Sequence, residues 1–362
     1  MFYAEITSGA KEIFMTPLER VLATIHLEEA DRVPCMPFIC GDSRRVYGCN
    51  YDEWSKDGEI AAWSFLQTQE IIGFDAILTK IDLNIEAADF GQEIIYLPEF
   101  PSYPNMKNTF VNNCDDYLLK INHVDPTKPG RMAEHIKTCD ILMNESGNTL
   151  PIFGFVNDPL GVLSIMRSPE LLFSDCITHC EEVQRALSVI TDVLEDYIRN
   201  LSKTGIPAIW IETIFGGHSH MNKKLWLKTS GNSLRRLADV TRECGMLLLA
   251  HSSNSSVYVD AHLEVLEPLA FSCAWLPDDC QSWIEAKHKW GKKLCLIGHV
   301  PPSQYLYLGT PGEVVEECRK EIKELAPGGG FILAPGWDFP HNASLLNAQA
   351  MVKAVELYGH YD

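Results

Sequence analysis

The segment "GMLLLAHS" (245–252) places an apolar run directly before a histidine, His251. A short apolar run of this kind is typical of a buried strand. Seven similar runs occur along the chain: "RVPCMPFI" (32–39), "FDAILTKID" (74–82), "LPIFGFVND" (150–158), "IPAIWIET" (206–213), "LAFSCAWLP" (269–277), "KLCLIGHV" (293–300) and "GGFILAPG" (329–336). Helical patterns separate most of them, at 168–205, 222–244, 279–291, 311–325 and 343–358. Because strands that alternate with helices form parallel sheets, eight of them predict an α/β fold, a closed (β/α)8 TIM barrel.

Two regions lie outside this alternation. Residues 1–30 form an N-terminal extension in which "TPLERVLATIHLEEADR" predicts a helix. Residues 91–130 form an insertion in which prolines stand among short alternating runs, and we expect a small hairpin there. We interpret residues 1–362 as one barrel domain, because α/β barrels of this length can be single domains.

Composition excludes several classes of function. The formal net charge is -19, which argues against nucleic-acid binding, since that needs a basic face. We find no apolar stretch long enough to span a membrane and no secretory signal pattern, so we expect a cytoplasmic location. The 12 cysteines are then reduced thiols. Cys176 and Cys180, four residues apart, are interpreted as ordinary helix packing.

Polar side chains follow the predicted strands, and these strand ends are the candidate site. In (β/α)8 barrels the active site is built at the carboxyl ends of the strands. The residues found there are Asp82, Asn157, Glu212, His218, His251, Trp275, His299, Trp337 and Asp338. A mouth that carries Glu, His and Asp side chains from several strands indicates an enzyme or a metal site.

Three further segments resemble a known family. "TPLERVLATIHLEEADRVP" (16–34), "IGHVPP" (297–302) with "LGTPGEVVEECRKEI" (308–322), and "GGGFILAPGWDFPHNASLLNAQAMVKAVELYG" (328–359) resemble the uroporphyrinogen decarboxylase-like superfamily. Within it the chain looks closer to the corrinoid-dependent methyltransferases of the MtaA/CmuA branch. The resemblance implies a (β/α)8 barrel and a methyl group exchanged with the cobalt of a corrinoid (cobalamin-type) cofactor, which a separate corrinoid-binding protein carries.

The resemblance also implies a zinc site, which this chain alters. Members that pass the methyl group to a thiol hold zinc with His-x-Cys after the fifth strand and a Cys after the eighth. Here His251 matches the first ligand, but Ser253 and Trp337 stand at the two Cys positions, and neither residue is a usual zinc ligand. Any remaining metal would need His251 with Glu212, His218 or Asp338, a set that would still suit zinc.

Decarboxylation of uroporphyrinogen is a weaker alternative. Its many carboxylates call for arginines on a glycine-spaced loop after the first strand. The corresponding "FICGDSRRVYGCN" (38–50) has adjacent Arg44 and Arg45 without that loop, and Ala274 stands where the family usually has Asp.

The sequence therefore predicts a methyltransferase that moves a methyl group from a methoxylated, aromatic substrate to the cobalt of a corrinoid protein, as the first component of an O-demethylase system. The expected catalytic residues are His251, Glu212 and His299; the expected substrate-binding residues are Trp337, Asn157, Trp275 and Asp82; and the expected metal ligands are His251, Glu212 and Asp338. Two alternatives stay open: a methylcorrinoid:thiol methyltransferase with an altered zinc site, and a non-catalytic paralogue that only binds the corrinoid protein. We allow for a homodimer.

Overall fold

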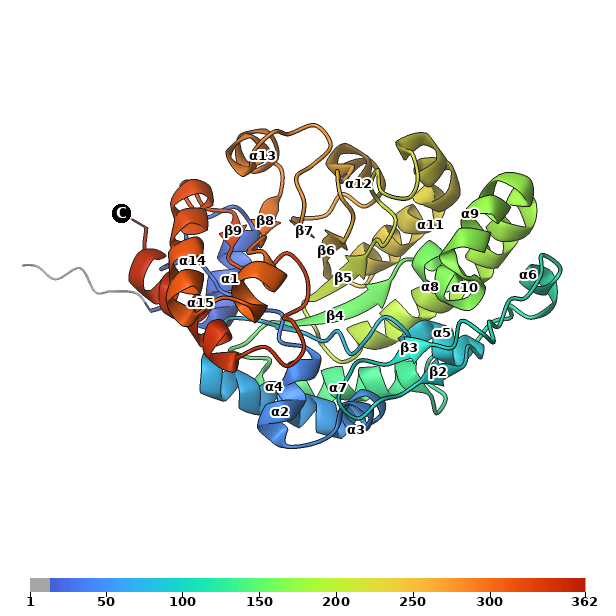
Figure 1. The fold of residues 1–362 in the computed structure, drawn as a ribbon, viewed down its shortest axis with the longest axis horizontal. Coiled ribbons are helices and arrows are strands. Elements are labelled where there is room, and N and C mark those ends of the chain that lie inside the picture. Colours follow the sequence, from blue (N-terminus) through green and yellow to red (C-terminus); the bar gives the residue numbers. More distant parts are fainter. Residues whose placement is uncertain (1–13, 362) are drawn as a thin grey trace, which may run out of the picture.

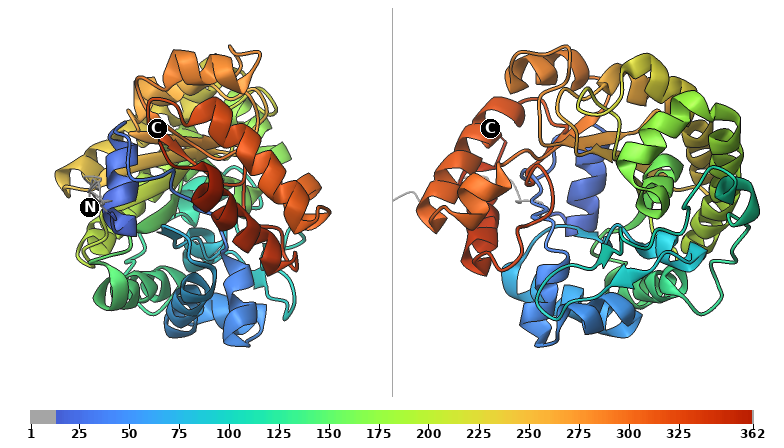
Figure 2. Two further views of the ribbon diagram at one scale, coloured as in Figure 1. Left: turned by 90° about the vertical axis from the view of Figure 1, so that its left-hand side faces the viewer. Right: turned by 45° about the vertical axis from the view of Figure 1, so that its right-hand side comes forward.

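The computed structural model describes residues 14–361 and turns seven of the eight apolar runs into one parallel sheet (Figure 1). Its strands, in spatial order, are β1 (Ile77–Leu78), β4 (Ile152–Asn157), β5 (Ala208–Glu212), β6 (Leu247–Ser252), β7 (Ala270–Cys273), β8 (Cys295–Ile297) and β9 (Phe331–Ile332). Each strand of this sheet pairs with the next strand of the sheet along the chain. The strands curl into a ring with helices outside it, which confirms the barrel (Figure 2).

The run at 32–39 differs from the prediction, because it is not a regular strand. It closes the ring through a single bridge between Cys35 and Leu333, supported by hydrogen bonds from Met36 N to Leu333 O (2.8 Å) and from Asp75 N to Cys35 O (2.8 Å). The physical reason is its two prolines, Pro34 and Pro37, which have no N–H to donate to a ladder.

Side chains alternate between the barrel interior and the surrounding helices. Along β5, Ala208 and Trp210 belong to the interior cluster, whereas Ile209 and Ile211 pack against the helical layer. The other strands follow the same period of two, which is the usual pleat of a strand. This alternation decides which strand-end side chains enter the mouth.

The helices follow the predicted segments with shifts at their ends. They are α1 (Pro17–Ile25), α2 (Arg44–Tyr47), α3 (Tyr51–Lys56), α4 (Gly58–Ile72), α5 (Ile85–Phe90), α6 (Asp116–Leu119), α7 (Arg131–Ser146), α8 (Pro159–Arg167), α9 (Pro169–Thr178), α10 (Cys180–Ser202), α11 (Lys223–Glu243), α12 (Val259–Val265), α13 (Trp283–Trp290), α14 (Pro311–Leu325) and α15 (Leu345–Tyr358), with a 3-10 turn at Gly41–Ser43 and a π-helical turn at Pro302–Tyr307. The helix expected over 168–205 is two helices, because the backbone of His179 (φ -132°, ψ 43°) leaves the helical region.

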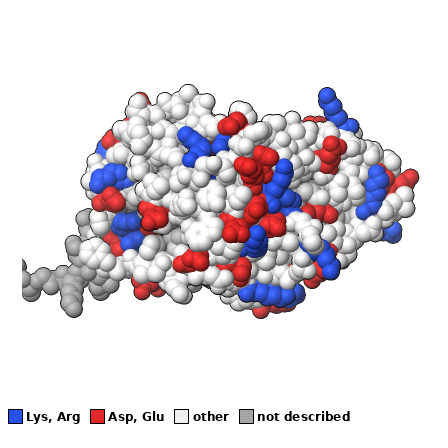
Figure 3. All heavy atoms as spheres, turned by 90° about the horizontal axis from the view of Figure 1, so that it is seen from below, with Lys and Arg blue, Asp and Glu red and all other residues white. Residues whose placement is uncertain are grey.

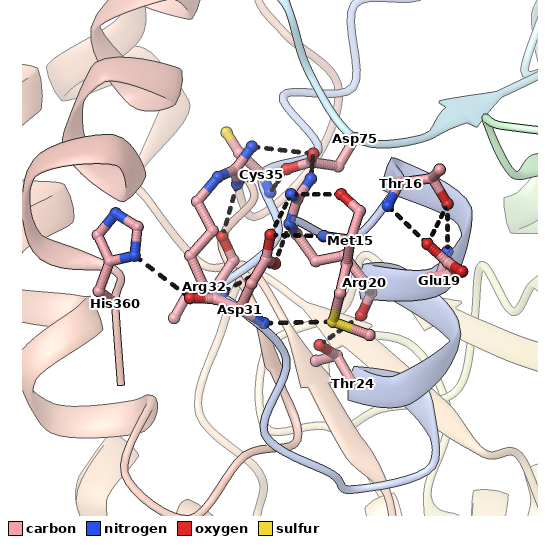
Figure 4. A network of polar contacts seen from close by, with 11 residues as sticks. Met15, Thr16, Glu19, Arg20, Thr24, Asp31, Arg32, Cys35, Asp75 and His360 are labelled. Atoms are coloured by element: carbon pink, nitrogen blue, oxygen red, sulfur yellow. Dashed lines mark hydrogen bonds and ion pairs between the residues drawn. The ribbon is translucent and has the colours of Figure 1, made fainter. Parts of the chain in front are cut away.

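The predicted N-terminal helix is present as α1 and lies at the amino-terminal end of the barrel. The first 13 residues of the extension fall outside the described part. Val21 and Ile25 of α1 pack into the interior cluster. Figure 4 shows the ion network that holds α1: Arg20 contacts Asp31 (2.6 Å) and Asp75 (2.7 Å), and Arg32 also reaches Asp75 (2.8 Å). Asp75 precedes β1, so this network fixes the helix to the amino-terminal end of the sheet.

The insertion contains the expected hairpin, formed by β2 (Ile94–Ile95) and β3 (Tyr103–Pro104) in antiparallel pairing. A buried ion pair anchors it. Asp82 accepts hydrogen bonds from Arg131 Nη2 (2.7 Å) and Ser102 Oγ (2.7 Å), and Arg131 Nη1 donates to the Tyr96 hydroxyl (2.8 Å). The hairpin therefore lies over the carboxyl end of β1.

The surface seen in Figure 3 carries acidic and basic side chains interleaved, without a basic field. Within residues 14–361, no helix is long and apolar enough to cross a membrane. All twelve cysteines lie in this range and are free thiols.

Candidate active site at the barrel mouth

Three ionisable side chains enter the mouth from inward-facing positions. Glu212 ends β5 two residues after inward-facing Trp210, and His251 follows inward-facing Leu249 on β6. Parallel pairing sets Glu212 opposite His251. Lys80 follows inward-facing Leu78 after β1 by the same period. Sequence reasoning missed Lys80, although a lysine near the end of the apolar run 74–82 was a signal that could have found it.

A hydrogen-bonded chain links Glu212, Ser253 and His251. Ser253 Oγ donates to Glu212 Oε1 (3.0 Å) and lies 3.2 Å from His251 Nε2. A hydroxyl has one proton, so Ser253 can only accept from His251. The imidazole therefore carries its proton on Nε2 and leaves Nδ1 bare, and this buried Nδ1 has no hydrogen-bond partner among the described residues.

The charge of His251 is suppressed by its surroundings. Burial lowers the pKa of its imidazole; the Glu212 carboxylate works against that effect and the Lys80 ammonium adds to it. One face of the ring stacks on Trp210, at 5.9 Å between centroids and 24° between planes. His251 is thus a neutral imidazole whose free nitrogen is an acceptor.

Lys80 carries a positive charge at the inner cavity that His251 and Glu212 also line. Burial disfavours its ammonium, but the carboxylates of Asp338 and Glu212 outweigh that cost and raise the pKa of Lys80 above its ordinary value. The Lys80 Nζ–Asp338 Oδ1 distance is 3.0 Å. A cation is therefore fixed at the mouth at neutral pH.

Two adjoining cavities meet at Lys80 and Asp338. The inner one, of only about 10 Å³, is lined by Glu212 and His251 together with Phe38, Leu78, Trp210 and Trp337. The outer one, of about 480 Å³, extends under the hairpin and is lined by aromatic side chains that include Tyr51, Tyr103, Phe215 and Phe339. This volume is in the range of small-molecule sites.

Trp275 and Trp337, both expected to bind substrate, come together near this opening. Their ring centroids are 6.2 Å apart and tilted by 37°. Trp337 lines the inner cavity, and Trp275 is 50% exposed. They give the mouth an apolar, aromatic surface.

His299 does not join His251, which corrects its expected place. Cys295 and Ile297 face inward on β8, so His299 would follow them by alternation. Gly298 breaks the pattern with a φ of +82°, which only glycine adopts without strain. His299 instead lies 3.2 Å from Glu321 of α14 and stacks on Trp283 of α13 at 3.7 Å.

The remaining candidates also have structural partners. Asp82 lines the outer cavity but is engaged by Arg131 and Ser102. The backbone N and Nδ2 of Asn157 donate to Glu86, at 2.9 and 2.7 Å. The His218 side chain is 59% exposed and 4.0 Å from Asp278, away from the inner cavity.

Zinc, which the family resemblance implies at the mouth, does not fit these residues. Glu212 Oε1 is 3.9 Å from His251 Nε2, but Asp338, the expected third ligand, is paired with Lys80. The Lys80 ammonium would also repel a cation. In the described part of the chain, no group of three His, Cys, Asp or Glu ligand atoms lying within 4.8 Å of one another includes His251.

A closed barrel with ionisable side chains gathered at the carboxyl ends of its strands defines the class of (β/α)8 barrel enzymes. A family model described as uroporphyrinogen decarboxylase (URO-D) matches residues 16–358, and the chain belongs to this family. The family domain thus covers nearly the whole described structure.

Individual relatives are distant but match end to end. The chain is 22% identical to the methylcobamide:CoM methyltransferase MtbA of Methanosarcina acetivorans, over 95% of this chain and 98% of the relative. It is 20% identical to MtaA of Methanosarcina barkeri, over 94% and 97%. A solved methyltransferase from Methanosarcina mazei superposes with a TM-score of 0.81 at 21% identity, over 95% of this chain and 99% of that one, and so has the same fold.

Proposed function

We propose that this chain is a corrinoid-dependent methyltransferase that takes its methyl group from a methoxylated aromatic substrate and passes it to the cobalt of a corrinoid protein. The relatives, named as methylcobamide:CoM methyltransferases, support methyl exchange with a corrinoid. The side chains at the mouth support transfer of the methyl group from the substrate to the cobalt. Ser253 and Trp337 stand where thiol-activating members have cysteines, and a lysine ammonium occupies the site instead.

The observation that carries the proposal is the Lys80–Asp338 pair at the junction of the two cavities, in which the Lys80 side chain is 11% exposed and that of Asp338 38%. In the proposed reaction the bond between the methyl carbon and the ether oxygen breaks, and the bonding electron pair stays on the oxygen. The corrinoid of the partner protein would supply a reduced cobalt that accepts the methyl group. The Lys80 ammonium stabilises the phenoxide as it forms, because preorganised charge in a water-poor site acts strongly on developing charge.

In this proposal His251 is a hydrogen-bond acceptor and not a proton donor. Its only N–H is directed to Ser253, so it does not donate to the ether oxygen. Its bare Nδ1 is buried and has no partner among the described residues, so it is an acceptor for a polar group that enters the inner cavity, and Glu212 holds this tautomer through Ser253. Glu212 is thus a positioning residue.

The cavities support an aromatic donor. The outer cavity of about 480 Å³ is mainly apolar and holds a substituted ring between aromatic side chains. The paired Trp275 and Trp337 provide an apolar face at which a flat macrocycle carried by another protein can approach. This face supports a corrinoid-binding protein as the partner.

The test supplies purified protein with reduced cobalamin and a methoxyphenol under anoxic conditions, and follows release of the free phenol. We expect turnover by the wild type and a loss of about 10²–10³-fold for Lys80→Met, the range found when one donor to a developing oxyanion is removed. Lys292→Met, at an exposed lysine before β8, is the matched control and keeps full activity.

The opposite half-reaction separates the thiol alternative. Methylcobalamin is supplied with a small thiol, and the thioether is measured. Thioether formation without any release of phenol would overturn the proposed direction of transfer. Activity of Lys80→Met equal to that of wild type would remove Lys80 from the mechanism.

A further inference from the structure

A second group of metal-ligating side chains lies away from the mouth, where the insertion meets the helical layer. Cys114 comes from the insertion, Asp175 from α9, and His179 from the break between α9 and α10. Their ligand atoms all lie within 4.8 Å of one another, and this is the one such group in residues 14–361. Asp175 is buried, whereas Cys114 and His179 are partly exposed, so an ion can enter from solvent.

The carboxylate of Asp175 is oriented as metal-binding carboxylates are. Its Oδ2 accepts a hydrogen bond from the Tyr117 hydroxyl (2.7 Å) and forms an ion pair with Arg167 Nε (2.9 Å). Unlike Asp338 at the mouth, Asp175 also has two further ligand side chains beside it. Its Oδ1 faces Cys114 Sγ at 3.6 Å. Protein groups that fix a ligand through its second oxygen are typical of metal sites, and here they leave Oδ1 to the other two ligands.

The spacing matches one edge of a zinc tetrahedron. With Zn–S of about 2.3 Å, Zn–O of about 2.0 Å and a tetrahedral angle, the sulfur and oxygen would be about 3.5 Å apart. The observed Sγ–Oδ1 distance is 3.6 Å. The break in the helix at His179 places an imidazole as the third ligand instead of a residue inside a continuous helix.

We propose that Cys114, Asp175 and His179 bind one zinc ion, with water as the fourth ligand, and that this ion fastens the insertion to the start of α10. Sulfur, nitrogen and oxygen donors together suit zinc among the common divalent ions. The proposal is independent of the function proposed for the mouth.

Binding must release a proton. In the metal-free structure the Cys114 thiol donates to Asp175 Oδ1 (3.6 Å), so it carries its proton. Zinc binds the thiolate, and the proton passes to solvent. If the group were only a hydrogen bond from the thiol to Asp175, the protein would bind no zinc here.

The test uses full-length protein stripped with a chelator and then supplied with one equivalent of Zn²⁺ or Co²⁺. Bound metal is counted by mass spectrometry after desalting, and thiolate ligation is read from the sulfur-to-cobalt charge-transfer absorption. We expect one ion per chain and the charge-transfer band in wild type. Cys114→Ser removes the band, and both Cys114→Ser and His179→Gln weaken zinc affinity at least about 10-fold.

Two controls make the result specific. Cys180→Ser changes the thiol beside His179 that is not in the group, and His251→Ala changes the mouth; both keep the metal and the band. Melting temperatures in chelator check that each variant folds. Absence of metal from wild type, loss of metal in His251→Ala alone, or an unchanged cobalt spectrum in Cys114→Ser would each overturn the proposal.

Discussion

His135 provides a test of how burial couples protonation to stability in this barrel. It lies on α7 and is 1% exposed. Thr79 Oγ1 donates its proton to Phe153 O (2.9 Å), so His135 Nε2–H donates to Thr79 (2.7 Å), and Nδ1 accepts from the Tyr197 hydroxyl. The neutral ring is fully hydrogen-bonded, and protonation at Nδ1 would break the bond from Tyr197. Burial accordingly lowers the pKa of His135 to about 4.

The magnitude follows from the two pKa values. Between pH 6.5 and 4 the unfolded chain, with a histidine pKa of about 6.5, binds more protons than the folded protein, so stability falls as pH falls. From pH 7 to pH 5 this one group removes about 2 kcal/mol from the free energy of unfolding. Burial raises the pKa of Glu86 and of Asp158 to about 7, and these groups act in the opposite sense. Only a comparison of variants therefore isolates His135.

The assay is equilibrium urea unfolding of wild type and His135→Gln at pH 7 and pH 5. We expect His135→Gln to be less stable at pH 7, and the difference from wild type to shrink by about 2 kcal/mol at pH 5, because glutamine has no proton to gain. His288→Gln, at an exposed position of α13, is the control and shows no such change. A difference that is the same at both pH values would refute the assignment of a buried neutral imidazole.

Two further predictions concern backbone and anchor positions. Asp82→Asn leaves Arg131 buried without its charged partner. We expect the free energy of unfolding, measured in urea, to fall by about 3–5 kcal/mol, the usual cost of breaking a buried ion pair. A loss below about 1 kcal/mol would show that the pair does not anchor the hairpin. In Gly298→Ala the new Cβ would lie 2.6 Å from Pro335 O, on a backbone whose positive φ is strained for alanine. We therefore expect the melting temperature to fall by at least about 3 °C. An unchanged melting temperature would contradict the kink that turns His299 outward.

The strand–helix alternation was readable from the sequence because each apolar run is fully buried and bounded by turns. The irregular closure at 32–39 was also encoded, in Pro34 and Pro37, but the apolar composition of the run outweighed them in the prediction. The break at His179 has no comparable local signal, since both flanking segments have ordinary helical patterns.

Only part of the site could be predicted, because some of its residues are placed by local strand pattern and others by contacts between distant segments. The period of two brings Glu212 and His251 to one mouth, and that period can be counted along each strand. One glycine, Gly298, redirects His299, and the pairing of Asp338 with Lys80 instead of a metal depends on contacts between strands far apart in the chain. The sequence pattern of a single strand cannot indicate such contacts.

The closure of the barrel at Cys35 and Leu333 makes its wall uneven in strength. The seven strands share ladders, whereas the segment 32–39 is joined to the chain after β9 by separate backbone hydrogen bonds, from Leu333 N to Pro34 O (2.9 Å), from Met36 N to Leu333 O (2.8 Å) and from Phe339 N to Phe38 O (3.2 Å). Its lower end is clamped by the charges of Arg32 and Asp75, whereas its upper end runs to Phe38, beside the inner cavity. Beyond Phe38 the same two segments stay joined, since Asn342 N donates to Asp42 Oδ1 (2.9 Å) and Arg45 Nη1 donates to Ala343 O (2.6 Å). Side-chain hydrogen bonds rather than a strand ladder therefore hold this part of the mouth together.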